Sequence, residues 1–356
     1  MLTHGFTMDA KGMKMSKSLG NTTNPLDLMR DTGADILRLW ALSVDFTEDH
    51  RIGKEILAGV ADQYRKLRNT FRYLLGALEG FDESERVADV AAMPELERYM
   101  LALLAKLDGT LKQAVADFDF NTYVRALTDF CNEDLSAFFF DIRKDCLYCD
   151  AADDPKRRAY RTVLDTLFHA LVRYAAPVLV FTAEEVWGTR FPEGGSVHLL
   201  VWPKVPGVET SPRHPGEGRG PASSDAAEDS RTPDQVRGDG LVANWKTIRT
   251  IRNGVNEAIE PYRRAKAIGS TMEAEVTLPM HTAYEGQYEA IDWSELCIAA
   301  NVTLLPPAGD FNGPVTVIRT THHKCGRCWR HLPEVPSDGD LCSRCDQVVA
   351  SMDAAA

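Results

Sequence analysis

The sequence lacks three features that would place it in other classes of protein. No apolar run reaches the roughly 18 residues that a helix needs to cross a bilayer, so we expect no transmembrane segment and no membrane partner. The first residues hold no basic stretch followed by an apolar one, so we expect no signal peptide and a cytoplasmic protein. The formal net charge of −12 argues against a protein that coats nucleic acid through its overall field.

What is present suits a folded chain of several domains. The 356 residues are enough for two or three domains, and an apolar fraction of 44% is ordinary for a globular protein. Eight cysteines without a secretion signal favour metal binding or buried thiols over disulfides.

The segment 49–202 has helical periodicity. Apolar residues recur at spacings of three and four in four stretches, which are 56–78, 96–111, 121–140 and 157–174. Each stretch has one apolar stripe, so we expect the helices to bury these stripes against one another as a bundle. Thr182-Ala-Glu-Glu185 has the pattern of a capping box, which predicts a further short helix.

Beyond the bundle the composition changes twice. Residues 203–240 are rich in Pro, Gly, Ser, Asp and Arg and nearly empty of large apolar side chains, so we expect a disordered linker. Residues 241–310 follow with a basic helix that Pro261 should interrupt near its end, and with an alternating strand pattern at Met272–Leu278. A shorter helix at Ile291–Ala300 completes the prediction of a small α/β region.

The string Lys14-Met15-Ser16-Lys17-Ser18 has a specific chemistry. Two lysines among serines, flanked by glycines, are typical of a mobile loop that closes over a triphosphate. Positive charge where pyrophosphate leaves stabilises the transition state more than the ground state. Composition alone favours a plain surface loop. The string, however, has a chance expectation of about one in ten thousand in such a chain, which favours the phosphate-binding interpretation.

Four cysteines near the C-terminus form a Cys-x2-Cys-x13-Cys-x2-Cys pattern, made of Cys325, Cys328, Cys342 and Cys345. Two such knuckles joined by a short polar loop place four thiolates tetrahedrally around Zn²⁺. Because this set leaves no open coordination position, we expect a structural rather than a catalytic zinc. The alternative, four reduced cysteines without metal, fits the spacing poorly.

The remaining cysteines predict no second metal site. Cys146-x2-Cys149 has no partner knuckle, and we interpret the pair as ordinary thiols at a helix end. Cys131 and Cys297 are expected in the core.

Basic residues gather locally despite the negative net charge. They follow Trp245 in the basic helix and recur beside the four cysteines. A solvated helix face is the alternative to a nucleic-acid contact for such runs.

These motifs together resemble the bacterial-type isoleucyl-tRNA synthetases. The lysine string, with Thr3–Phe6 before it and Gly33–Trp40 after it, is similar to the second signature of class I aminoacyl-tRNA synthetases. Tyr64–Thr70 and Asp145–Asp150 resemble the helical anticodon-binding domain of the Ile, Val, Leu and Met branch. The segment Lys324–Arg330, with the second knuckle, is similar to the C-terminal zinc module of the isoleucyl enzymes.

The resemblance implies a mainly α architecture in which a helical-bundle anticodon-binding domain follows the lysine-loop end of a class I catalytic domain. A small α/β region and a zinc-ribbon module come after the bundle. The expected boundaries are 1–48 for the catalytic end, 49–202 for the bundle, 203–240 for the linker, 241–310 for the α/β region, 311–350 for the zinc module and 351–356 for the tail.

The resemblance also implies a reaction, isoleucine–tRNA ligation, in which ATP with Mg²⁺ activates isoleucine and the adenylate esterifies tRNA-Ile. Lys14 and Lys17 would contact ATP phosphates within the ATP-binding string. The tRNA contacts it implies come from basic and aromatic residues of the bundle, the basic helix and the zinc module: Arg65, Arg68, Arg72, Lys246, Arg249, Arg252, Arg327, Trp329 and Arg330. For Trp329, stacking on a base and packing over the zinc site remain equal alternatives.

The sequence departs from the family pattern in one large respect. The His-x-Gly-His signature, its nucleotide-binding fold and the editing domain are not in it. We therefore expect a monomer that is inactive alone and that has the N-terminal catalytic and editing half as its partner, on the same or a separate chain. The alternatives are a non-catalytic tRNA-binding protein derived from a synthetase and a zinc-ribbon adaptor for another partner.

Overall fold

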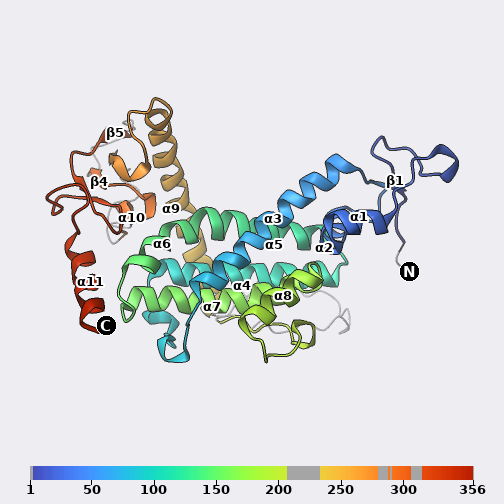
Figure 1. The fold of residues 1–356 in the computed structure, drawn as a ribbon, viewed down its shortest axis with the longest axis horizontal. Helices are drawn as coiled ribbons and strands as arrows, with labels where there is room; N and C mark the ends of the chain where they lie inside the picture. Colours follow the sequence, from blue (N-terminus) through green and yellow to red (C-terminus); the bar gives the residue numbers. More distant parts are fainter. Residues whose placement is uncertain (1–2, 207–232, 280–287, 289–290, 306–314, 356) are drawn as a thin grey trace, which may run out of the picture. The chain divides into compact units, whose positions relative to one another are not determined.

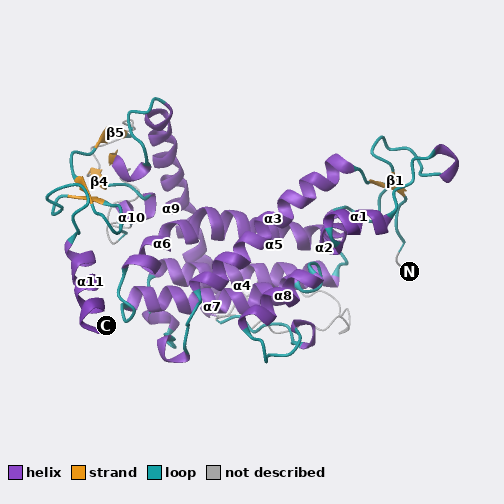
Figure 2. Ribbon diagram, viewed as in Figure 1, coloured by secondary structure: helices purple, strands orange, loops and turns teal. Residues whose placement is uncertain are grey.

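The computed structural model describes residues 3–206, 233–279, 288, 291–305 and 315–355. Within these ranges the chain is mostly helical with a few short strands (Figure 2), which confirms the mainly α prediction. The chain divides into two compact units. Unit 1 contains Met1–Phe139 and Ala159–Gly240, and unit 2 contains Phe140–Arg158 and Leu241–Ala356. No helix in the described ranges is both long and apolar enough to cross a membrane.

Unit 1 is a bundle of helices that carries the N-terminal hairpin (Figure 1). Its regular elements are β1 (Thr7–Met8), α1 (Pro25–Thr32), α2 (Ala34–Ser43), β2 (His50–Arg51), α3 (Lys54–Ala77), α4 (Glu95–Ala116), α5 (Phe120–Asp129), the π-helical segment η4 (Phe130–Phe139), α7 (Pro155–Ala175) and α8 (Val180–Arg190). The expected apolar stripes form its core, in which Leu74, Leu104, Leu135 and Phe168 are fully buried. Asn24 caps α1 and Pro25 occupies its first turn, as the sequence predicts.

Two local predictions for unit 1 need correction. The helix expected at 121–140 continues through η4 into α6 (Phe140–Cys149), because the π-helical turns widen the helix without ending it. The further short helix is present as α8, but Thr182 does not cap it; the residue lies inside the first turn. The buried carboxylate of Asp35 in α2 accepts hydrogen bonds from the Thr182 backbone N–H and hydroxyl, both at 2.7 Å. A side chain distant in sequence therefore satisfies the donors that a capping box would have used.

Unit 2 packs helices and a small sheet around the cysteine module. Its elements are α6, α9 (Pro233–Arg264, in this unit from Leu241), β3 (Ala274–Pro279), α10 (Trp293–Cys297), β4 (Asn301–Leu305), β5 (Thr316–Arg319), β6 (His323–Lys324), β7 (His331–Leu332) and α11 (Ser343–Ala355). The sheet order is β4-β3-β5, with β4 parallel and β5 antiparallel to β3. Alternate β3 residues are buried, as the alternating pattern predicts.

Three predictions for unit 2, and one for the segment before it, need correction. Pro261 does not interrupt α9, which continues to Arg264. The proline lacks only its own N–H, and its carbonyl still accepts from the Ala265 N–H over 2.9 Å. Met272 lies in a short 3₁₀ turn, and the strand begins at Ala274. The helix expected to reach Ala300 is shorter because Ile298 adopts a left-handed conformation with φ of 54°. In the segment expected as a linker, α9 begins at Pro233, and residues 207–232 lie outside the described residues.

Candidate metal centre and lysine loop

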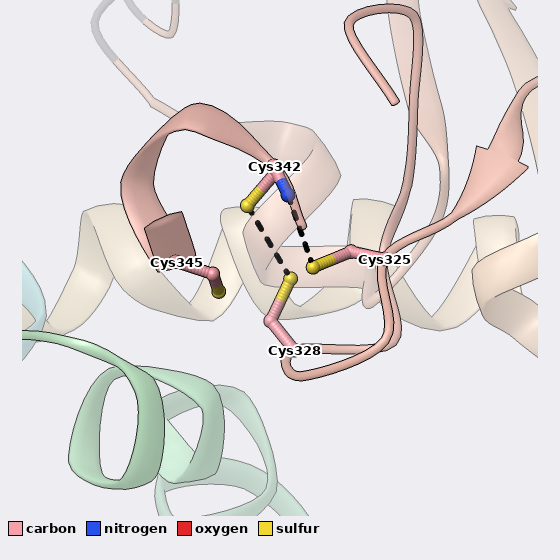
Figure 3. A group of neighbouring side chains, drawn as sticks. All are labelled: Cys325, Cys328, Cys342 and Cys345. Carbon is pink, nitrogen blue, oxygen red and sulfur yellow. Dashed lines mark hydrogen bonds between the residues drawn. The ribbon is translucent and has the colours of Figure 1, made fainter. Parts of the chain in front are cut away.

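The four cysteines predicted to bind zinc are brought together in unit 2. Their sulfur atoms all lie within 4.8 Å of one another, and all four residues are buried (Figure 3). The Sγ atoms of Cys328 and Cys342 are 3.9 Å apart. Four sulfurs at about 2.3 Å from one tetrahedral Zn²⁺ would be separated by roughly 3.8 Å. The thiol set therefore fits a structural zinc, as the spacing predicts.

Backbone hydrogen bonds shape both knuckles. The Trp329 N–H donates to the Cys325 carbonyl over 3.0 Å and the Asp346 N–H to the Cys342 carbonyl over 2.9 Å, which turns the chain around each pair. Only glycine fits at position 326, because a Cβ atom on Gly326 would lie 2.3 Å from the Gly339 carbonyl oxygen. Burial acts to raise the pKa of the Cys325 thiol. Backbone N–H groups, including those of Cys328 and Cys342, outweigh it and lower that pKa. For Cys328 and Cys342 burial prevails and raises the pKa.

The module has almost no apolar core of its own. Its buried cluster consists of the four cysteines, Val335 and Cys149, with Leu332 and Leu341 partly buried against it. α6 does end at Cys149, as predicted, but the interpretation of an ordinary thiol missed its packing against the metal module. Burial raises the pKa of the Cys149 thiol to about 12.

A cavity of about 470 Å³ opens beside the first knuckle, entirely within unit 2. α6, α10 and the segment after Cys325 form its walls, and Arg327, Trp329 and Arg330 line it together with Tyr148. Trp329 is 58% exposed, and the ammonium of Lys324 lies 5.1 Å from the centroid of its ring. An aromatic face that is this accessible can stack on a ligand, and it does not pack as a buried cover over the cysteines.

The predicted ATP-binding string lies on a hairpin of unit 1. The Asp9 N–H donates to the Met13 carbonyl over 2.9 Å, and Gly12 takes a positive φ of 79° at the turn. Ser16 caps a short 3₁₀ turn (Lys17–Leu19), and its hydroxyl lies 2.7 Å from that of Ser18.

Asp9 and Asn21 hold this hairpin from within. The Asn21 amide nitrogen donates to the Asp9 carboxylate over 2.9 Å, and the Asn21 amide oxygen accepts from the Ser16 N–H over 2.8 Å. The hydrogen bond from Asn21 lowers the pKa of Asp9. Lys14 and Lys17 remain exposed while the backbone that carries them is fixed, an arrangement that presents two cations to an anion. Asp9 and Asn21 were not among the predicted site residues.

The predicted tRNA contacts of α3 are on the surface of unit 1. Arg72 is exposed. Arg65 pairs with Asp62 at 3.0 Å, and Arg68 makes two hydrogen bonds of 3.0 Å with Glu185. Ion pairs at such exposed positions contribute little to stability, so a phosphate can compete for these arginines.

The predicted tRNA-contacting residues of α9 differ in how far they are buried. Lys246 is exposed and Arg249 is half-buried. Arg252 is only 8% exposed, and its Nε donates to the Leu296 carbonyl over 2.7 Å. Burial lowers the pKa of Arg252, and its guanidinium serves to join α9 to α10.

Comparisons with known proteins match most of the chain. The family model described as the anticodon-binding domain of tRNA ligase matches residues 97–278, and the one described as class I tRNA synthetases (I, L, M and V) matches residues 1–53. The chain is 54% identical to the isoleucine–tRNA ligase of Zymomonas mobilis over 98% of this chain and 34% of that protein. It is 44% identical to that of Gluconobacter oxydans over 99% of this chain and 34% of that protein. It thus spans about a third of the length of these relatives.

Proposed function

Because the chain belongs to the isoleucyl-tRNA synthetase family of class I tRNA ligases, we propose that it is the tRNA-reading part of an isoleucine–tRNA ligase. The reaction is ATP-dependent activation of isoleucine followed by transfer to tRNA-Ile. The observation that carries the proposal is the 54% identity to an isoleucine–tRNA ligase over 98% of this chain. The geometry of the four cysteines and of the lysine hairpin supports it.

The lysine hairpin supplies positive charge to the activation step. Lys14 and Lys17 would contact the phosphates of ATP bound with Mg²⁺, and the hydroxyls of Ser16 and Ser18 add donors. Their exposure on a backbone fixed by hydrogen bonds supports this role. The chemistry requires the N-terminal catalytic and editing half, which we propose as the partner of this chain, on the same or a separate chain in the cytoplasm.

Most of the remaining predicted site residues are proposed to bind tRNA. Zn²⁺ held by the four cysteines would order the module, and the module would present Trp329 for stacking and Arg330 for phosphate. Arg65, Arg68 and Arg72 on α3, with Lys246 and Arg249 on α9, complete the proposed surface. We leave Arg252 out of this set because its guanidinium is buried against α10.

Competition binding tests this function. A labelled tRNA-Ile bound to the purified monomeric chain is challenged with unlabelled tRNA-Ile, tRNA-Leu or tRNA-Val. We expect tRNA-Ile to compete about 10-fold better than the others, a difference of about 1.4 kcal/mol. Equal competition by all three would instead favour a zinc-ribbon adaptor.

A second assay separates the ligase from a non-catalytic tRNA-binding protein. The purified chain alone should give no isoleucine-dependent ATP–pyrophosphate exchange, and exchange by the chain alone would refute this expectation. Exchange should appear when an N-terminal catalytic half is added, and Lys17→Ala should abolish it. Continued absence of exchange would favour the non-catalytic alternative, for which the exposed lysine pair has no evident use.

A further inference from the structure

Both cysteine knuckles carry an arginine at the same position. The first reads Cys325-Gly-Arg327-Cys328 and the second Cys342-Ser-Arg344-Cys345. Arg327 is an expected tRNA contact, and Arg344 is one of the basic residues beside the cysteines. Both arginine side chains contact the C-terminal end of α6.

Arg327 connects a metal ligand to this helix end. Its Nη1 donates to the Cys149 carbonyl over 2.6 Å, and its Nη2 donates to the Tyr148 carbonyl over 3.2 Å. The same Nη1 lies 3.8 Å from Sγ of Cys345. The last carbonyls of a helix have no partner within it and carry partial negative charge, so a cation is well placed there.

Arg344 binds two carboxylates of the same helix end. Its Nη1 lies 2.8 Å from both Asp145 and Asp150, and its Nη2 donates to Asp145 over 3.0 Å. The pair with Asp145 is the two-pronged geometry in which arginine binds a carboxylate most firmly. The Asp150 side chain is only 9% exposed, so losing Arg344 would leave a largely buried carboxylate without this partner.

These contacts leave little of either guanidinium for RNA. Arg330, two residues after Cys328, differs: it lines the cavity and makes no side-chain hydrogen bond or ion pair within the described ranges. A phosphate contact is therefore expected from Arg330, whereas Arg327 and Arg344 serve the contact between the module and α6. The module and α6 also form cavity walls, together with α10.

We propose that Arg327 and Arg344 are positioning residues that clamp the metal module to the end of α6 and so hold Trp329, Arg330 and the cavity in the geometry that receives tRNA. The consequence for tRNA rests on the proposed function. The clamp itself can be tested on the protein alone.

The first experiment measures zinc affinity by competition with a chelator in the full chain. Arg327→Ala should weaken zinc binding about 10-fold, because groups that hydrogen-bond a metal ligand tune its affinity. Arg344→Ala and Asp145→Ala should each weaken zinc binding, and the double variant should be no weaker than the worse single one. Independent effects that multiply in the double variant would overturn the clamp.

The second experiment separates positioning from phosphate contact. The variants are saturated with Co²⁺, whose absorption spectrum should match that of the wild type if all four thiolates still bind. Arg344→Ala should then bind tRNA-Ile about 10-fold more weakly with an unchanged dependence of log K on log salt. Arg330→Ala is the matched control. It should reduce the slope of log K against log salt by about one, the amount expected for the loss of one phosphate contact. A reduced slope for Arg327→Ala or Arg344→Ala would overturn the proposal.

Exchanging the charges provides a rescue. Arg344→Asp combined with Asp145→Arg should restore tRNA affinity to within about 3-fold of the wild type, since a neighbouring pair is re-formed. A double variant as weak as Arg344→Asp alone would contradict the clamp. If the wild-type chain shows no preference for tRNA-Ile, the proposed function fails, and the chelator experiment still decides whether the clamp exists.

Discussion

Glu295→Gln should destabilise unit 2 by about 3 kcal/mol at pH 7, because it removes the carboxylate from a largely buried ion pair and weakens the compensation of the buried guanidinium. Oε1 of Glu295 lies 2.8 Å from Nη1 of Arg143, whose side chain is only 5% exposed. It also lies 2.6 Å from Nζ of Lys156, whose side chain is 37% exposed. The partly exposed lysine should contribute only about 0–1 kcal/mol of the loss. Glutamine keeps the shape of the side chain and removes the charge, so the loss reports on the ion pair.

The same ion pair has a defined pH dependence. Burial acts to raise the pKa of Glu295, but Arg143 and Lys156 outweigh it, and the net pKa is lowered. A carboxyl whose pKa is lower in the folded state contributes its full stability above its unfolded pKa, about 4.3. That contribution is lost as the pH falls through the folded value. The difference between wild type and Glu295→Gln should therefore be full at pH 7 and shrink below about pH 4.

Hydrogen exchange of peptides from α10, followed against urea concentration, measures the stability of this unit without assuming that the whole chain unfolds in one step. Lys156→Gln is the matched control and should cost less than about 1 kcal/mol. A loss below about 1 kcal/mol for Glu295→Gln at pH 7, or a difference that persists unchanged at pH 3, would refute the reasoning.

Three further predictions concern the other sites. Cys342→Ser should release zinc and unfold the module, because metal binding is coupled to folding in such units; metal analysis and hydrogen exchange of α11 would check this, and unchanged metal content would contradict it. Asp35→Ala should destabilise unit 1 by about 2–3 kcal/mol, since the buried N–H and hydroxyl of Thr182 lose their acceptor; urea unfolding measures the loss, and a change within about 0.5 kcal/mol would contradict it. Asn21→Ala should speed tryptic cleavage after Lys14, because the hairpin loses its internal hydrogen bonds. Amide hydrogen exchange of α4 should stay unchanged. An unchanged cleavage rate would show that Asn21 does not hold the loop.

The helical bundle could be predicted because each helix has one apolar stripe, which period and spacing reveal directly. The four-cysteine site could be predicted because metal geometry restricts ligand spacing. The helix boundaries could not. Asp35 accepts the hydrogen bond of a backbone N–H in the first turn of α8 from a position 147 residues away in sequence. The π-helical segment η4 joins α5 to α6 without a break. α9 also continues past Pro261 to Arg264, although a proline there lacks the backbone N–H of that position.

The surroundings of the metal site were harder to predict for a similar reason. The pairing of Arg344 with Asp145 joins residues 199 apart, which no local pattern indicates. The burial of Arg252 also depends on α10, far along the chain, so a basic run alone could not separate it from its exposed neighbour Lys246. The repeated Cys-x-Arg-Cys pattern was a visible signal, although sequence alone does not distinguish a phosphate contact from a clamp.

Aminoacylation in an extract of the source cells would show whether this chain serves isoleucine–tRNA ligation. An antibody raised against this chain is used to deplete the extract, and attachment of isoleucine, leucine and valine to tRNA is measured before and after depletion. We expect isoleucine attachment to fall while leucine and valine attachment stay unchanged. Undiminished isoleucine attachment in a fully depleted extract would contradict this expectation.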